Sequence, residues 1–430
     1  MNILVIGNGF DLAHNLPTSY KDFLGFITYI NVFFNGDAQT INNYKYAENF
    51  KKLHPDIQDY ILKISELNKN DKLIKEIIEL SSDNFWIKYF EKCIQSNELR
   101  GDNWIDFESE ITKVVKSLEY LKNYNEDNLK LTVGNRKYTD NQALYQISKE
   151  IIKKISDRLK SKGEINTILE YEDIMKSGHN YSNIENHFFC SSNSKKVISE
   201  LNMELNKLIR CLEIYLDYVV KENIKINKQL DDINNINHIN HLISFNYTST
   251  FENFYSNNTE CDYIHGKANK NNNFETNNMV LGIDEYLDSS DKDIELDFIQ
   301  FKKYFQRIYK KTGCEYKKWL EKIKENNLIF NKSICSDKFS TNIYFYGHSL
   351  DITDKDILTE LINLEKSQII IFYLDDYDYM QKIVNLVKLV GQDYLCENVY
   401  GSDPKIIFKE INKENQIENL EKTSTSLILT

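Results

Sequence analysis

Residues 1–20 read MNILVIGNGFDLAHNLPTSY, and this stretch decides the fold. Residues 2–6 form a short, largely β-branched apolar run, which is typical of a buried central strand. Gly7, Asn8 and Gly9 follow at once, and glycines at a strand end let the backbone turn sharply and let a phosphate approach without meeting a Cβ atom. The stretch therefore predicts a strand, a tight turn and a helix that together hold a nucleotide.

The glycine turn departs from the dinucleotide-binding fingerprint GxGxxG. Leu12 stands where the third glycine would be, and no acidic strand-end residue follows about 20 positions later, as a dehydrogenase would need. Hydride transfer is therefore a weak interpretation. On the glycines alone, a tight turn without a ligand and a nucleotide-binding turn are about equally good interpretations.

The composition limits the classes of protein that this chain can be. A length of 430 residues allows roughly two to three domains, and 41% hydrophobic residues supply ample core material. The net charge of −12 argues against a protein that coats nucleic acid. The chain starts directly on a strand and has no apolar run long enough to span a bilayer. We expect a cytoplasmic protein whose partners include neither nucleic acid nor a membrane.

The seven cysteines lie far apart and form neither a CxxC pair nor a cluster with histidine at metal-ligand spacing. We therefore expect no metal cofactor.

The apolar periodicity divides the chain into distinct parts. Helical patterns dominate from about residue 46 to 235, at 56–67, 71–80, 84–97, 104–124, 142–161 and 196–226. Short apolar runs separated by helical segments return at 241–245, 262–265, 279–282, 342–346, 368–374 and 405–408. Such runs are typical of a parallel sheet that is covered on both faces.

These patterns predict an α/β fold, a Rossmann-type parallel sheet with helices on both faces, interrupted by a large all-helical insertion. We expect the discontinuous α/β nucleotide-binding domain at 1–45 and 236–411, the helical insertion domain at 46–235, and a polar C-terminal tail at 412–430.

Polar residues follow several of the predicted strands. Asn246 stands where a side chain would point into the ligand crevice of a parallel sheet, although by itself a helix cap is the better interpretation. His265 has a side chain suited to general base catalysis, although a lone histidine is more often structural. Gly347, Ser349 and Asp351 suit contact with a ribose or a phosphate, or a turn.

Glu108 falls on an apolar helical stripe that includes Trp104, Phe107 and Ile111. A carboxylate on an apolar face needs a partner. Glu108 either reaches the nucleotide crevice as support for the pocket or forms a structural hydrogen bond or an ion pair with Arg or Lys, and the structural alternative is favoured.

Five segments carry a resemblance to a known family: GNGFDLAHNLPTSYKDF, WIDFESEI, SFNYT, YIHG and YGHSLDITDKDI. Their order and style resemble the AbiH bacteriophage abortive infection family over most of the chain. The same elements are similar to the sirtuin-like fold. In that comparison Gly7, Gly9, Asp11 and the corner Asn15-Leu16-Pro17 match the opening sirtuin motif, while Asn246, His265-Gly266 and Gly347-His348-Ser349-Leu350 match the later ones.

The chain departs from sirtuins in lacking the four-cysteine zinc module, and in having Asp11 for the usual Ser and His348 for Thr. The resemblance therefore implies, instead of protein deacylation, the chemistry of sirtuin-like defence effectors, which cleave NAD at the nicotinamide bond without a metal.

The resemblance also implies roles for individual residues. Asn246 would orient the water and the ribose hydroxyls, and His265 would accept a proton. The nucleotide-binding set would comprise Gly7, Asn8, Gly9, Asp11, His14, Thr18, Gly347, Ser349 and Asp351. Within this set, Gly7 to Gly9 would hold the pyrophosphate, and Asp11 and His14 would lie at the lip of the pocket.

Two functional hypotheses follow. The first is an intracellular anti-phage effector that hydrolyses NAD as its substrate and is kept inactive by the helical insertion or by self-assembly until a phage-derived or defence-system protein triggers it. The second is a nucleotide-binding sensor or interaction module without turnover. A nuclease or nucleic-acid glycosidase is disfavoured by the acidic balance and by the lack of a clustered metal-carboxylate motif.

Overall fold

The computed structural model describes residues 1–36, 38–67, 71–98, 105–122, 151, 154–155, 157–158, 161, 192–226, 228–255, 258–285, 296–330 and 339–412. The chain divides into two compact units. We call them the sheet unit (Met1–Lys75, Leu212–Val280 and Arg307–Thr430) and the helical unit (Glu76–Cys211 and Leu281–Gln306). The domain boundaries predicted from the sequence stay predictions.

The sheet unit contains a six-stranded parallel sheet, which confirms the predicted fold class. Its strands are β1 (Asn2–Ile6), β2 (His241–Ser244), β3 (Glu260–Tyr263), β4 (Thr341–Tyr346), β5 (Ser367–Tyr373) and β6 (Ile406–Glu410). They lie in the order β3-β2-β1-β4-β5-β6. The first strand is therefore central, and Ile3 pairs with His241 on one side and Ile343 on the other.

The described helices agree with most of the predicted helical patterns. They are α1 (Asn8–Ala13), α2 (Tyr20–Asn35), α3 (Ala38–Lys45), α4 (Glu48–Lys51), α5 (Pro55–Leu67), α6 (Lys72–Ser81), α7 (Phe85–Glu98), α8 (Phe107–Lys122), α13 (Ser192–Ile214), the π-helix η1 (Tyr215–Val220), α14 (Lys221–Asn223), α15 (Asp231–Asn234), α16 (Thr250–Phe254), the 3₁₀ helices η2 (Ile299–Phe301) and η3 (Ile352–Asp354), α17 (Lys303–Lys310), α18 (Glu315–Phe330), α19 (Lys355–Ile362), α20 (Asp376–Val390) and α21 (Gln392–Val399). Most of the predicted helix at 142–161, Trp104, and the tail beyond residue 412 lie outside the described residues. Among the described helices, none is long and apolar enough to cross a bilayer.

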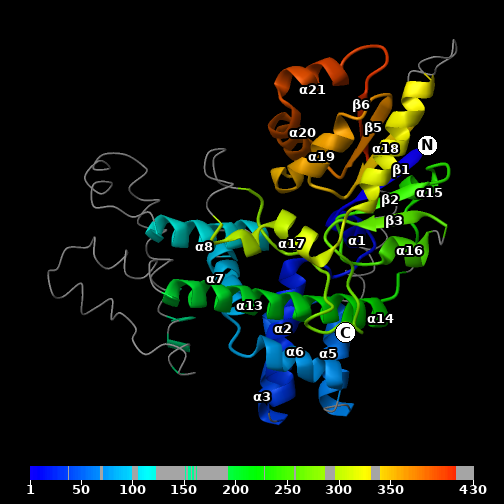
Figure 1. Ribbon diagram of the computed structural model, residues 1–430. Helices are drawn as coiled ribbons and strands as arrows, with labels where there is room; N and C mark the ends of the chain where they lie inside the picture. The colour runs from blue at the N-terminus through cyan, green and yellow to red at the C-terminus, as the bar shows by residue number, and fades with distance from the viewer. Residues whose placement is uncertain are drawn as a thin grey trace. The chain divides into compact units, whose positions relative to one another are not determined.

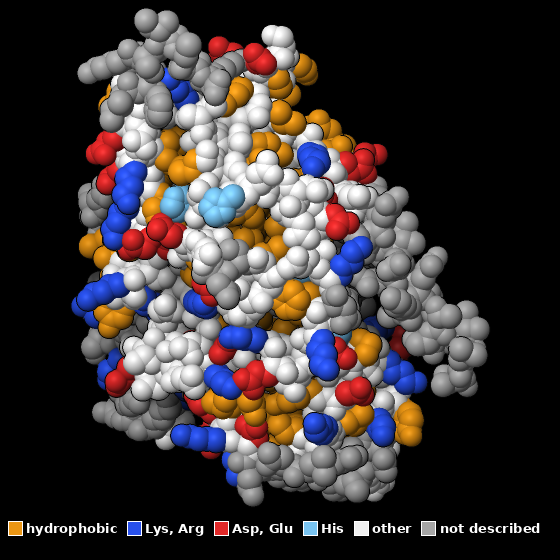
Figure 2. Space-filling view, turned by 90° about the vertical axis from the view of Figure 1, so that its right-hand side faces the viewer, with side chains coloured by type: hydrophobic (Ala, Val, Ile, Leu, Met, Phe, Trp, Pro, Cys, Tyr) orange, Lys and Arg blue, Asp and Glu red, His pale blue; other side chains and the backbone are white. Residues whose placement is uncertain are grey.

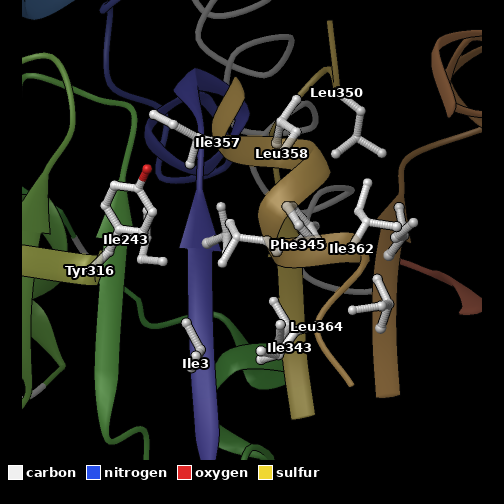
Figure 3. Close-up of a cluster of buried hydrophobic side chains, with 14 of the residues drawn as sticks. Ile3, Ile243, Tyr316, Ile343, Phe345, Leu350, Ile357, Leu358, Ile362 and Leu364 are labelled. Carbon is white, nitrogen blue, oxygen red and sulfur yellow. The ribbon is translucent and has the colours of Figure 1, made fainter. Parts of the chain in front are cut away.

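One face of the sheet packs against α18, α19, α20 and α21. Alternate residues of the strands point to this face, among them Ile3 and Val5 of β1 and Phe345 of β4, and all three are fully buried. Figure 3 shows Ile357 and Leu358 of α19 gathered with the strand side chains of this core. Figure 1 shows α19, α20 and α21 next to β5 and β6.

The intervening strand residues form a second core on the opposite face. Leu4 and Ile6 of β1 and Leu242 of β2 pack there with Phe10 of α1 and Phe251 of α16. Burial on both faces explains why the strands are continuously apolar instead of alternating with polar residues.

The predicted strand at 279–282 is wrong. The segment is buried, but its described backbone hydrogen bonds do not form a strand ladder: the Val280 amide donates to the His265 carbonyl (2.8 Å), and the Met279 amide donates to Asn277 Oδ1 (2.9 Å). Burial produced the apolar pattern, and apolar pattern alone does not distinguish a buried loop from a strand.

The helical unit has its own buried core and polar network. The indole of Trp86 is fully buried and donates to the carbonyl of Leu201 (2.9 Å). Arg158 contacts Glu204, with 2.9 Å between Nη1 and Oε2.

On the face of the molecule that Figure 2 shows, basic and acidic side chains are interspersed.

The turns that follow β1 and β4 touch each other through glycines. The Gly9 amide donates to the Gly347 carbonyl (2.8 Å). A Cβ atom at Gly9 would lie 2.7 Å from the Gly347 Cα, and one at Gly347 would lie 2.2 Å from the Phe10 nitrogen. Gly347 also has a φ of +65°, which L-residues rarely adopt. The close approach of the two turns therefore requires glycine at both positions.

Substitution of Gly347 by alanine tests this contact. We expect Gly347→Ala to lower the free energy of unfolding by about 3–5 kcal/mol, because the methyl group clashes with backbone as well as straining φ. Urea denaturation measures the effect.

The matched control is Gly391→Ala. Gly391 has a φ of +88°, but a Cβ there meets nothing within 4 Å, so strain alone should lower the free energy of unfolding by about 1–2 kcal/mol. Equal losses in the two variants would contradict a steric role for the glycine contact.

Candidate functional site

The strand order places a reversal point between β1 and β4. From β1 the chain builds outward through β2 and β3 on one side, and then through β4, β5 and β6 on the other. In open parallel sheets, ligands bind at the carboxyl ends of the strands where the order reverses. The residues after β1, β2, β3 and β4 are therefore the candidates for a functional site.

Backbone hydrogen bonds within the protein hold the Gly-x-Gly turn in place at this reversal point. The amides of Gly7, Gly9 and Phe10 donate to the carbonyls of Tyr346, Gly347 and Gly7, respectively. These amides are already used within the protein, so the glycines serve the packing of two strand ends in this structure. Pyrophosphate binding by Gly7, Asn8 and Gly9 stays a prediction.

A buried polar cluster lies directly beside this turn, and we call it the Asp11 cluster (Asp11, Asn246, Thr248 and Thr250). Asn246 Nδ2 donates to the Gly7 carbonyl (3.0 Å) and to Asp11 Oδ2 (3.2 Å). Thr248 Oγ1 donates to the same Asp11 oxygen (2.6 Å) and accepts from Thr250 Oγ1 (3.2 Å). The cluster thus joins the ends of β1 and β2.

Asp11 is the least ordinary member of this cluster. Its side chain is 1% exposed, and its Oδ1 atom has no hydrogen-bond partner among the described residues. Burial raises its pKa to about 6, although the hydroxyls of Thr248 and Thr250 favour the ionised form. A buried carboxylate oxygen without a partner is costly, and such a group is a reasonable position for a ligand contact.

A pocket lies on the other side of Thr248 and Thr250. Its lining is mostly apolar and includes three side chains from the π-helix η1. The lining residues are Leu16, Leu216, Asp217, Val220, Lys221, Ile224, Ile226, Thr248, Ser249, Thr250, Asn253, Phe254 and Ala268. The hydroxyl of Thr248 therefore links the pocket wall to the Asp11 carboxylate.

A second cluster, the histidine–aspartate cluster, contains His265, His348 and Asp354. His265 Nε2 lies 3.1 Å from Asp354 Oδ1, and His348 Nε2 lies 3.9 Å from Asp354 Oδ2. The Leu350 amide donates to His348 Nδ1 (2.9 Å), so the proton of a neutral His348 is on Nε2, facing Asp354. The ring of Phe245 contacts both imidazoles, at 5.5 and 4.3 Å between centroids.

This arrangement gives His265 the partner that a general base requires. A carboxylate on one imidazole nitrogen orients the ring and stabilises its protonated form. Asp354 stands just before α19, and its carboxylate contacts His265. All three members are at least 93% buried, with 4% exposure for both histidines and 7% for Asp354.

The predicted lip position of Asp11 and His14 is not what the structure shows, because both side chains are buried. His14 Nδ1 donates to the Phe10 carbonyl (2.7 Å), so its Nε2 accepts from the Tyr255 hydroxyl (2.7 Å). Burial lowers the pKa of His14. Both nitrogens are engaged, so His14 fixes α1 against Tyr255 in this structure.

The remaining predicted contacts lie around the two turns. Thr18 Oγ1 donates to Asn8 Oδ1 (2.8 Å), and the corner before Thr18 is held by the Tyr215 hydroxyl, which donates to the Pro17 carbonyl (2.7 Å). Ser349 is exposed, and Asp351 accepts from the Thr353 amide (3.0 Å) as the cap of η3.

Glu108 belongs to the helical unit and shows the ion-pair alternative. Its Oε2 lies 2.6 Å from Nζ of Lys303, which is 3% exposed. The sequence could not name this partner, because Lys303 lies far along the chain.

From the sequence, Asn246 and His265 are placed at the right strand ends, but their contacts are not identified. Thr248 and Asp354 were part of quoted motifs, and the available signal was that each motif follows the end of a strand. Among the residues that the structure describes, no group of His, Cys, Asp and Glu has the arrangement of metal ligands.

Comparison with protein-family models matches residues 3–375 to the family described as Bacteriophage abortive infection AbiH. The matched range contains both polar clusters, β1 from its second residue onward, and β2 to β5. Neither a curated protein nor a solved structure matches the chain.

The raised pKa of Asp11 predicts a pH-dependent stability difference. The folded pKa of about 6 exceeds the reference value of 3.8, so the folded state holds this proton more tightly and loses stability as Asp11 ionises between about pH 4 and pH 6. The variant Asp11→Asn cannot ionise. We expect its free energy of unfolding, relative to wild type, to rise over this interval by up to about 3 kcal/mol in urea titrations.

Thr248→Val is the companion variant. It removes a hydroxyl that stabilises the Asp11 anion, so the folded-state pKa should rise and the pH interval of lost stability should extend to higher pH. Parallel pH profiles for wild type and Asp11→Asn would show that Asp11 does not titrate in this range.

Proposed function

We propose that this chain, which belongs to the bacteriophage abortive infection AbiH family, hydrolyses NAD at the bond between nicotinamide and ribose. The family gives the chain a role in phage abortive infection. Hydrolysis of NAD is the activity that we propose for that role, because loss of NAD stops the metabolism on which phage growth depends.

The observation that carries the proposal is the buried Asp11 carboxylate. Its unpartnered Oδ1 can accept a hydrogen bond from a ribose hydroxyl, while Asn246 and Thr248 hold its other oxygen in place. This oxygen lies among residues that follow β1 and β2, at the reversal point where α/β sheets bind nucleotides. The sirtuin-like interpretation of Asn246 and His265 is part of the proposal.

The chemistry requires positioning and electrostatics more than acid catalysis. Cleavage of the C1′–N bond produces an oxocarbenium-like ribose, and nicotinamide leaves from the positively charged pyridinium as a neutral molecule. An ionised Asp11 would stabilise the developing positive charge, and the Asn246 amide would orient the ribose and the attacking water. The nearby apolar pocket lined by Leu216 and Val220 would take a flat apolar group.

His265 would take the proton of the attacking water. Its contact with Asp354 leaves the imidazole oriented and able to carry a positive charge. Asp354 is therefore a positioning residue in this proposal, and His348 supports it from the other side.

The second candidate function is a nucleotide-binding sensor without turnover. Two observations favour it: the amides of the glycine turn are used internally, and His265 is only 4% exposed. A module that only binds a nucleotide needs no base that reaches water.

We also address where the protein acts and what activates it. We propose that the protein acts in the cytoplasm and stays inactive until a phage-derived or defence-system protein triggers it. NAD is the substrate, and nucleic acid, membrane and metal are not required for this chemistry.

Alanine substitutions of Asn246 and His265 test the activity. We expect each to reduce nicotinamide release from NAD at least about 100-fold, because a positioned base or orienting group contributes that much to catalysis. Asp354→Asn should lower kcat with little change in KM. Chromatography of nicotinamide measures the rate, with purified protein incubated with and without phage lysate.

The matched control is His238→Ala, since His238 is exposed. It should leave nicotinamide release unchanged, and thermal denaturation should show that all variants fold. Saturable NAD binding without nicotinamide release, under activating conditions too, would favour the sensor over the hydrolase.

A further inference from the structure

Helix α20 (Asp376–Val390) carries two apolar faces, and only one of them packs against the sheet unit. Leu386 and Leu389 are buried in the core shared with β4 and β5. The opposite side exposes Tyr377 (69%), Met380 (55%), Val384 (45%) and Val387 (39%). We call these four residues the α20 stripe.

The spacing of the α20 stripe is that of a helix-pairing seam. Its members recur at intervals of three, four and three residues, which is the a/d pattern of a heptad. Surface apolar residues that occur singly need no explanation, but four on one side of one helix indicate an interaction surface. The stripe runs over most of the helix, which begins at the Asp375 cap and ends at Gly391.

The charges along α20 indicate which partner fits. The N-terminal end exposes the carboxylates of Asp375 and Asp376, and the C-terminal end exposes the ammonium group of Lys388. A second copy of α20 in antiparallel orientation would place each acidic end beside a basic end and would oppose the two helix dipoles. A parallel copy would place like charges together.

We propose that the α20 stripe is the interface of a homodimer in which two copies of α20 pack antiparallel about a two-fold axis. Such an interface uses the same patch on both subunits, so the self-complementary charges are what two-fold symmetry requires. With the axis between Met380 and Val384, Met380 faces the partner's Val384. Asp376 then lies near the partner's Lys388.

The test is the oligomeric state of the full chain by sedimentation equilibrium over a roughly hundredfold range of protein concentration. Wild type should form a concentration-dependent dimer, and Met380→Asp should raise its dissociation constant at least about tenfold, because it introduces a charge at the centre of the seam. Leu328→Asp is the matched control. Leu328 is an apolar residue on α18 that is at least as exposed (66%) as Met380, and its substitution should leave the dimer intact.

Charge reversal tests the antiparallel arrangement. Asp376→Lys and Lys388→Asp should each weaken the dimer, because each creates two like-charge pairs, whereas the double variant should restore it. Wild type that stays monomeric, or a Met380→Asp dimer of unchanged affinity, would overturn the interface. A double variant as weak as the single ones would overturn the antiparallel arrangement.

Discussion

The contact between the turns after β1 and β4 is the constraint on which the sheet unit depends. The chain order reverses between these two strands, so their carboxyl ends must lie side by side without a helix between them. A hydrogen bond from the Gly9 amide to the Gly347 carbonyl joins the two turns where they meet. The same contact sets the distance between the two polar clusters, since Asp11 follows one turn and His348 lies in the other.

The two clusters handle buried negative charge in different ways. Asp354 lies between two imidazoles, either of which can take a proton and neutralise it. The described hydrogen bonds to Asp11 come from neutral groups, the Asn246 amide and the Thr248 hydroxyl. Burial without a cation raises the pKa of Asp11 to about 6, so this carboxylate favours a positive charge that develops beside it.

The sequence predicted the local structure well because that structure depends on short-range patterns. The largely apolar 2–6 run, followed at once by Gly-x-Gly, is typical of a buried strand, and the polar residues at strand ends pointed to Asn246 and His265. The order of the strands, which brings Asp354 to His265 and Thr248 to Asp11, depends on long-range pairing that periodicity does not contain. The same limit explains two wrong predictions, the exposed position of His14 and the strand at 279–282. The type of a residue, apolar or polar, does not specify which residues surround it in the fold.

Helix α20 connects the proposed interface to the site by its other face. Asn385 is buried on that face, and its Nδ2 donates to the Ser349 carbonyl (2.9 Å) in the turn that contains Gly347 and His348. A helix that is fixed by a partner on its exposed side is less free to move on its buried side. The helix that carries the proposed interface is therefore also the helix that holds the turn in which His348 contacts Asp354.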